Sequence, residues 1–100
     1  MTKKELVQII KDNFTNEDGE VNIYGMDFGN CDVNIGGLKT NGYLYQDYQK
    51  VGKTLYQDHQ EVGRILFQNR QKVEGNLYQN NQKVEGFIWQ YNHNAKEIIN

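Results

Sequence analysis

Serine is missing from this chain of 100 residues, and cysteine occurs once, as Cys31. Without serine there is no nucleophile of that type, and a lone cysteine cannot form an intramolecular disulfide. The sequence also lacks a glycine-rich phosphate loop and any cluster of cysteine and histidine at metal-ligand spacing. These absences predict a protein that is not an enzyme and that binds no metal or other cofactor.

Long apolar runs are absent as well, so no segment of the sequence is predicted to span a bilayer. The opening stretch mixes charged with apolar residues, unlike the apolar region of a signal peptide. The unpaired Cys31 suits a reducing compartment. Together these features predict a cytoplasmic protein.

Apolar residues are also scarce, at 37% of the composition with a mean hydropathy of −0.86. An ordinary globular domain has roughly 45–50% apolar residues, so a compact globule is not expected. Disorder is not expected either, because seven tyrosines, four phenylalanines and one tryptophan recur at fixed spacing. The 13 acidic and 11 basic residues alternate along the chain, so the basic stripe typical of nucleic-acid binding is absent.

What the sequence does contain is a unit of 11 residues, repeated four times between Leu44 and Phe87. The four copies read LYQDYQKVGKT, LYQDHQEVGRI, LFQNRQKVEGN and LYQNNQKVEGF. Apolar positions within and between the copies alternate at spacings of five and six residues. Two units, about 22 residues, therefore predict one coil of a solenoid.

A five-residue rhythm precedes these copies, at Ile23, Phe28, Val33, Leu38 and Tyr43. The corresponding triplets VNI, MDF, CDV, GGL and NGY resemble units of the pentapeptide-repeat family, although the alanine usual at the front of the unit is missing. That resemblance implies a square, right-handed β-helix in which each unit forms one face.

The 11-residue copies can also be cut into strands joined by two-residue hairpins, which predicts an antiparallel β-meander instead. Glycine argues against the meander, because four glycines would lie near the middle of its strands, where each costs about 0.5–1 kcal/mol relative to alanine. In a solenoid these glycines would lie at corners: Gly52, Gly63, Gly75 and Gly86. The alternate corners would adopt the left-handed conformation at Asp47, Asp58, Asn69 and Asn80. We therefore favour a mainly β, right-handed solenoid and keep the meander as the alternative.

The chain is predicted to form a single domain, residues 1–100, with four segments. Residues 1–15 form a helical cap, because Thr2 and Glu5 have the spacing of a capping box, and residues 21–43 form the pentapeptide-like region. Residues 44–91 carry the 11-residue repeats, and residues 92–100 form a C-terminal cap. The side chains expected to cover the two ends are Leu6, Ile10 and Phe14 at one, and Ala95, Ile98 and Ile99 at the other.

The predicted interior contains the recurring apolar positions and Cys31. The core positions are Phe28, Val33, Val51, Val62, Val73 and Val84. A 22-residue coil would also stack Gln49 over Gln71 and Gln60 over Gln82, where their amides can hydrogen-bond. A glutamine-lined recognition surface is the alternative for these residues.

The recurring Gly-x-Leu-Tyr-Gln and Gln-x-Val-x-Gly elements of residues 26–90 resemble short proteins of phages and prophages of low-GC Gram-positive bacteria. The resemblance implies a mobile-element protein in a bacterial host cell. Because no catalytic constellation exists, the predicted function is a non-catalytic module that binds a host protein. Such a module could inhibit a nuclease or other defence component by occlusion, as an anti-CRISPR-type protein does. The alternatives are a self-assembling structural repeat protein, with a homodimer through an edge or end, and a nucleic-acid-binding repeat protein.

Candidate binding residues are those that differ between copies, because packing requires the same residue in every unit whereas a partner surface does not. One side chain at a repeat corner is Tyr48, and the equivalent places hold His59, Arg70 and Asn81. Lys53 and Arg64 vary near the other corner. Tyrosine and arginine are common at protein–protein hot spots. The predicted partner-binding residues are therefore Tyr48, Lys53, His59, Arg64, Arg70 and Asn81.

Overall fold

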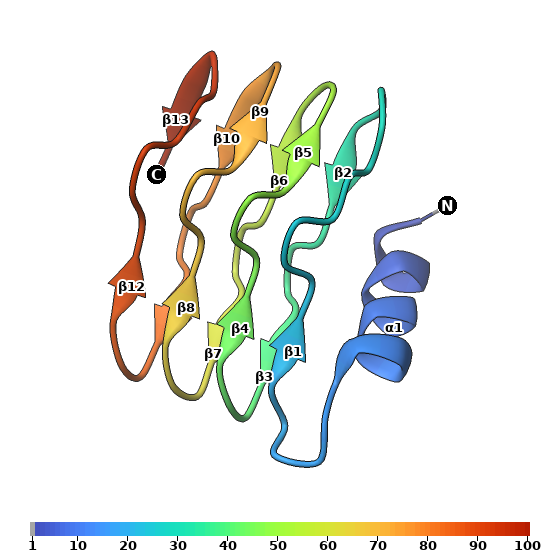
Figure 1. The fold of residues 1–100 in the computed structure, drawn as a ribbon, viewed down its shortest axis with the longest axis vertical. Coiled ribbons are helices and arrows are strands. Elements are labelled where there is room, and N and C mark those ends of the chain that lie inside the picture. The colour runs from blue at the N-terminus through green and yellow to red at the C-terminus, as the bar shows by residue number, and fades with distance from the viewer. Residues whose placement is uncertain (1) are drawn as a thin grey trace.

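A computed structural model describes residues 2–100 as a mainly β solenoid with one N-terminal helix (Figure 1). The helix is α1 (Lys3–Phe14), and it is followed only by strands of two or three residues. The strands are β1 (Val21–Asn22), β2 (Val33–Asn34), β3 (Lys39–Thr40), β4 (Leu44–Tyr45), β5 (Lys50–Val51), β6 (Leu55–Tyr56), β7 (Glu61–Val62), β8 (Leu66–Phe67), β9 (Lys72–Val73), β10 (Asn76–Tyr78), β11 (Lys83–Val84), β12 (Ile88–Trp89) and β13 (Glu97–Ile99).

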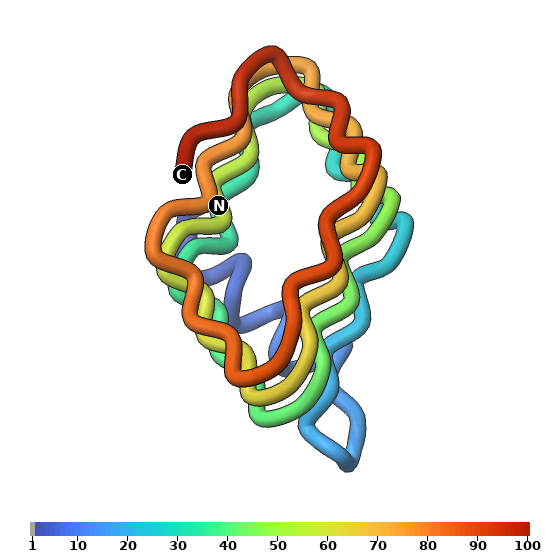
Figure 2. Tube along the Cα trace, turned by 90° about the vertical axis from the view of Figure 1, so that its left-hand side faces the viewer, coloured from blue at the N-terminus to red at the C-terminus, as the bar shows by residue number. Residues whose placement is uncertain are grey.

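All strand pairs are parallel, and most partners lie 22 residues apart, as in Leu44↔Leu66 and Leu55↔Leu77. The strands build four faces, with the orders β1-β4-β8-β12, β13-β10-β6-β2, β11-β7-β3 and β5-β9. Seen from the C-terminal end, the chain runs counterclockwise as it approaches the viewer, so the solenoid is right-handed (Figure 2). The predicted 22-residue coil is confirmed, and the meander is wrong because its strands would pair antiparallel with their sequence neighbours.

Most of the short strands point one apolar side chain inward, and equivalent residues of successive coils stack. Leu44, Leu55, Leu66 and Leu77 are fully buried, and the core also contains Ile23, Ile35 and Leu38. Of the predicted core residues, Val33, Val51, Val62 and Val73 are only 2% exposed. The prediction is wrong for Phe28 and Val84, which are only half-buried. They belong to the first and last coils, where a neighbouring coil covers them on one side only.

Glycine lies at the corners, as predicted, because the backbone of the preceding coil approaches there. A Cβ on Gly52 would lie 2.6 Å from the Cα of Asn30, which leaves no space for a side chain. The left-handed residues, in contrast, are displaced by one position from the prediction. They are Tyr48, His59, Arg70 and Asn81, with φ between 52° and 59°, and not the Asp or Asn before each.

The physical reason is that the aspartate side chain before the turn residue bonds to the next coil. Asp47 accepts a hydrogen bond from the backbone N–H of Asn69 at 2.6 Å, and Asp58 accepts one from Asn80 N–H at 2.7 Å. Each aspartate therefore joins two coils, and the residue after it makes the turn. In the first coil the turn positions are held by Gly25 and Gly37, which adopt positive φ without steric penalty.

Glutamine fills the middle of the interior. Gln46, Gln49, Gln57, Gln60, Gln68 and Gln71 are fully buried, so a glutamine recognition surface is wrong for these residues. The predicted stacks are confirmed, since Gln71 Nε2 donates to Gln49 Oε1 at 2.8 Å and Gln82 Nε2 donates to Gln60 Oε1 at 2.9 Å. Bonds also cross between the two halves of a coil, as from Gln46 Nε2 to Gln57 Oε1 at 3.1 Å. The interior is therefore a polar network bordered by leucine and valine.

Two buried amide atoms have no hydrogen-bond partner among residues 2–100, namely Gln49 Nε2 and Gln71 Oε1. They are the two ends of one stack. The strand register places Met26 before Gln49 and His93 after Gln71 in that stack. In this stack the amide of Gln71 donates to that of Gln49. Neither Met26 nor His93 has an amide side chain that would continue the stack, so one donor and one acceptor remain unpaired.

Helix α1 covers the N-terminal end of the solenoid. Its capping box is present, with Glu5 N–H donating to the Thr2 hydroxyl at 3.2 Å. Ile10 is buried against the core, and Leu6 is half-buried. The prediction is wrong for Phe14, which remains 39% exposed and does not cover the end. This helix, the only one among the described residues, is not long and apolar enough to cross a membrane.

The last segment extends a sheet and does not fold across the end of the solenoid. β13 pairs with β10, and Ile98 lies next to Leu77 in the register. Ala95 and Ile99 are half-buried, but Ile98 is 39% exposed, so the predicted closure by Ile98 is wrong. Cys31 is exposed as well, and the prediction that it is buried is wrong. Its thiol lies in the loop before β2, where it donates to the carbonyl of Phe28 at 3.2 Å.

Candidate protein-binding face

The six predicted binding residues are all exposed, but the structure distributes them over several corners of the coil. Tyr48 and Arg70 are stacked at one corner, as predicted, and His59 and Asn81 lie at the equivalent corner 11 residues later. Arg64 precedes β8, whereas Lys53 precedes β6 on a different face. The structure therefore groups Tyr48, Arg64 and Arg70 around one sheet and leaves the other three residues outside that group.

That sheet is β1-β4-β8-β12, and its solvent side carries an aromatic cluster. The rings of Tyr45 and Phe67 are stacked, with centroids 5.0 Å apart and planes 3° from parallel. Tyr43 packs beside both rings, with centroid distances of 6.0 Å to Tyr45 and 6.1 Å to Phe67. All three residues are half-buried, because each ring is covered on one side by a neighbouring ring.

An arginine lies at each border of this cluster. The guanidinium carbon of Arg64 is 5.7 Å from the centre of the Tyr43 ring, and that of Arg70 is 5.8 Å from the centre of the Tyr48 ring. Both distances are within the range of a cation–π interaction. We name the surface formed by Tyr43, Tyr45, Tyr48, Arg64, Phe67 and Arg70 the aromatic face.

The electrostatics of the aromatic face favour the neutral form of Tyr45. Desolvation raises the pKa of Tyr45, and the nearby Glu20, Tyr43 and Asp47 raise it further. The hydroxyl of Tyr45 therefore remains a hydrogen-bond donor at neutral pH. Together with the two guanidinium groups, the face offers several donors around an apolar centre.

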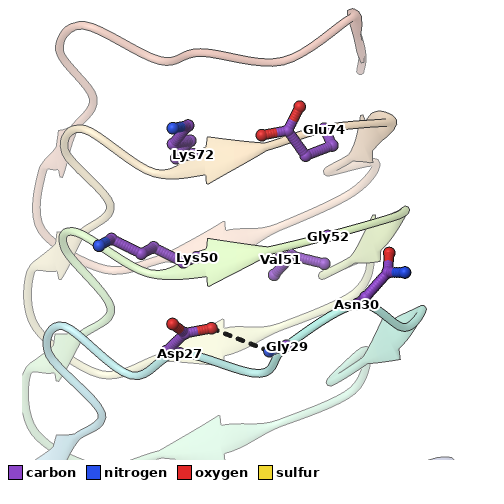
Figure 3. Close-up of a pocket in the computed structure, with 8 residues that line it drawn as sticks. All are labelled: Asp27, Gly29, Asn30, Lys50, Val51, Gly52, Lys72 and Glu74. Carbon is purple, nitrogen blue, oxygen red and sulfur yellow. Dashed lines mark hydrogen bonds between the residues drawn. The ribbon is translucent and has the colours of Figure 1, made fainter.

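A shallow pocket of about 260 Å³ lies on the adjacent β5-β9 sheet (Figure 3). Lys50 and Lys72 are in register there, on neighbouring strands. Asp27 and Glu74 lie at the border of the pocket, and the Asp27 carboxylate accepts a hydrogen bond from the N–H of Gly29 at 2.9 Å. Neither lysine is within ion-pair distance of an acidic group, whereas on the opposite sheet Lys39 pairs with Glu61 at 3.1 Å.

The histidines have structural positions. His59 occupies an exposed turn, and His93 is half-buried beside the glutamine network. A ring nitrogen of His93 lies 2.5 Å from the carbonyl of Gln68, and the other lies 2.7 Å from Gln90 Nε2. Burial lowers the pKa of His93, against the effect of the Gln68 carbonyl. Within residues 2–100, no group of three His, Cys, Asp or Glu side chains is arranged to hold a metal ion.

Sequence reasoning missed the centre of the aromatic face, because Tyr45 and Phe67 occupy a position that is aromatic in every copy, whereas the prediction selected positions that vary. A signal was available, since the two residues are 22 apart and the predicted coil length stacks them directly. Tyr43 precedes the first full repeat, and the four copies have Thr54, Ile65, Asn76 and Phe87 at its place. The residue at this place differs between copies, and the same kind of variation was the reason for predicting Tyr48 as a binding residue.

No family model, curated protein or solved structure matches this chain. The resemblances to pentapeptide-repeat proteins and to phage repeat proteins therefore stay predictions from the repeat pattern. The functional argument depends on the surface itself.

Proposed function

We propose that the protein is a non-catalytic binding module that docks a partner protein on its aromatic face. One observation carries the proposal: a stacked aromatic cluster with an arginine at each border lies on the solvent side of a repeated scaffold. Tyrosine and arginine are enriched among the residues that dominate protein–protein affinity. The leucine ladder beneath the cluster is fully buried, so the face is held in place before a partner arrives and little conformational entropy is lost on binding.

The orientation of the rings favours a protein over a nucleic acid. Single-stranded nucleic acids bind by stacking bases on the faces of aromatic rings. On this surface the facing sides of Tyr45 and Phe67 are in contact with each other, and Tyr43 lies beside them. Tyr48 likewise has Tyr24 at 5.3 Å and Arg70 at 5.8 Å. The cluster offers ring edges and hydroxyl groups to a partner, which suits packing against apolar and hydrogen-bonding protein groups.

We propose the class of partner from the resemblance of the repeat to phage and prophage proteins. A phage- or prophage-type protein of this size, without catalytic residues, would act by occluding a surface of a host protein. A nuclease or other defence component is the class of target that we propose, in the bacterial cytoplasm.

Paired corner variants test the proposal. The chain carrying Tyr48→Ala and Arg70→Ala is compared with the chain carrying His59→Ala and Asn81→Ala in affinity capture from bacterial lysate. The two pairs occupy equivalent turns with positive φ, so their effects on the scaffold are matched. We expect the first variant to bind the captured partner at least tenfold more weakly, about 1.4 kcal/mol, at nearly unchanged thermal stability, and the second to bind normally. Equal capture by both variants would refute the aromatic face as the docking surface.

A further inference from the structure

The charges of the coil are segregated between its two halves. The exposed cations of the second and third coils lie along one half of the solenoid. They extend from the aromatic face, past the Tyr48 corner, to the β5-β9 sheet. They are Arg64, Arg70, Lys72, Lys50 and Lys53. We name this group the basic side.

Few acidic groups oppose these five cations. Asp47 lies among them but is only 7% exposed, and its carboxylate is bound to the N–H of Asn69. Glu74 follows β9 and is exposed, and the exposed Glu85 lies near Arg64, because the N–H of Gly86 bonds to the Arg64 carbonyl. Asp27, Glu20 and Asp32 belong to the first coil, and Asp32 accepts a hydrogen bond from the N–H of Thr54. Along the second and third coils the basic side is therefore positive, although the whole chain has a formal charge of −2.

The opposite half of the coil shows that this pattern is not imposed by the repeat. The positions equivalent to Lys50 and Lys72 are Lys39, Glu61 and Lys83, which alternate in sign along the stack. Lys39 and Glu61 form an ion pair there. On the basic side two lysines are instead neighbours in register, and like charges in that arrangement repel one another. The repulsion is relieved when an anionic group approaches both of them.

From these observations we infer that the partner presents an acidic protein surface with an apolar centre, which contacts the basic side and the aromatic face together. This inference rests on the proposed function and names the chemistry of its partner. The apolar centre packs on Tyr43, Tyr45 and Phe67, and carboxylates around it meet Arg64 and Arg70. Lys50 and Lys72 lie around the Tyr48 corner and steer the approach of the acidic partner by their longer-range field.

The experiment uses the full chain and short peptides selected from a random display library. Selected peptides should be rich in Asp and Glu around Leu, Ile or Phe. We expect their affinity to fall about tenfold for Arg64→Ala with Arg70→Ala, and about threefold for Lys50→Ala with Lys72→Ala. Lys39→Ala with Lys83→Ala removes the same charge from the opposite half and should change affinity less than about twofold. Raising sodium chloride from about 50 to about 500 mM should weaken binding to the unmodified chain.

The outcomes separate this inference from the proposed function. If the selected peptides have no excess of acidic residues but fail to bind the Tyr45→Ala chain, the inference of an acidic partner is overturned. The docking face would then stay in place. Peptides that bind equally to Tyr45→Ala, or a failure to select any, would overturn both. Tighter binding of a short DNA than of any selected peptide, lost in the Arg64 and Arg70 variant, would also overturn both and assign the surface to nucleic acid.

Discussion

The β1-β4-β8-β12 sheet and the β2-β6-β10-β13 sheet are made from the same repeat, yet only the first of them carries the aromatic face. Both point leucine inward, and both stack aromatic rings outside, Tyr45 on Phe67 at 5.0 Å and Tyr56 on Tyr78 at 4.9 Å. Their borders differ. The first has Tyr43 with Arg64 and Tyr48 with Arg70, whereas the second has Lys53 and Thr54 at one border and His59 and Asn81 at the other.

This difference shows how an 11-residue repeat can produce two unlike surfaces. Equivalent residues of consecutive copies lie in opposite halves of the coil, and those of alternate copies stack on the same face. A substitution in alternate copies therefore changes one face along its whole length. Positions that pack inward remain the same in every copy, because each must fill the same space.

The largest expected effect tests whether the two halves are equal as scaffolds. Leu66→Ala and Leu55→Ala each empty a fully buried position, and each should lower the free energy of unfolding by about 2–5 kcal/mol through lost burial and a cavity. Urea unfolding of the two variants measures the difference. A much larger loss in one half would show that the inward repeat is not equivalent on both sides.

The glutamine network connects the halves, and its loss should come next in size. Gln57 takes part in bonds with Gln46, Gln68 and Gln71. Gln57→Leu removes these bonds from the buried network, at a cost of about 1–3 kcal/mol. The matched surface change, Gln8→Leu on the exposed side of α1, should alter stability much less in the same thermal unfolding experiment. If the Gln57→Leu chain unfolds at the same temperature as the unmodified chain, the network contributes little to stability.

The outer rings distinguish scaffold from surface. Tyr45→Ala and Tyr56→Ala each remove one member of a stacked pair and should each lower stability by about 0.5–1.5 kcal/mol, in addition to any lost burial. Only Tyr45→Ala should weaken partner capture, because only that ring belongs to the aromatic face. Equal loss of capture in both variants would place the binding surface elsewhere or on both sheets.

The corner turns should respond alike in both halves. Arg70→Gly and His59→Gly each relieve a side chain held at positive φ and should raise stability by up to about 1 kcal/mol. Arg70→Gly alone should reduce partner capture. A loss of stability in both would indicate that these side chains contribute more by contact than they cost by strain.

The smallest expected effect is a pH dependence of the last coil. Burial lowers the folded-state pKa of His93 below its usual value of 6.5, so the unfolded chain binds more protons than the folded chain between the two values. The stabilisation is complete above pH 6.5 and is lost as the pH falls from there through the folded-state pKa. Thermal unfolding across this range should show the decline, and His93→Asn should reduce it. His59→Ala, at an exposed corner, should leave it unchanged.

The sequence by itself determined the coil. A leucine, two glutamines and a valine at fixed places in 11 residues are enough to predict a 22-residue repeat and the glutamine stacks. Thr2 and Glu5 predict the capped N-terminus, and each of these predictions depends only on local spacing. The sequence also selected Tyr48, Arg64 and Arg70 as variable, exposed residues. These features require only that equivalent residues stack on one another.

The tertiary structure decided where neighbouring coils support one another and where they do not. Phe28, Val84 and Ile98 follow the inward pattern, but their burial depends on a coil on each side, which no periodicity records. Cys31 is exposed because its loop turns outward before β2. The aromatic face likewise exists only after coiling, since Tyr45 and Phe67 meet across 22 residues of chain and acquire an arginine at each border from the corners that folding brings beside them.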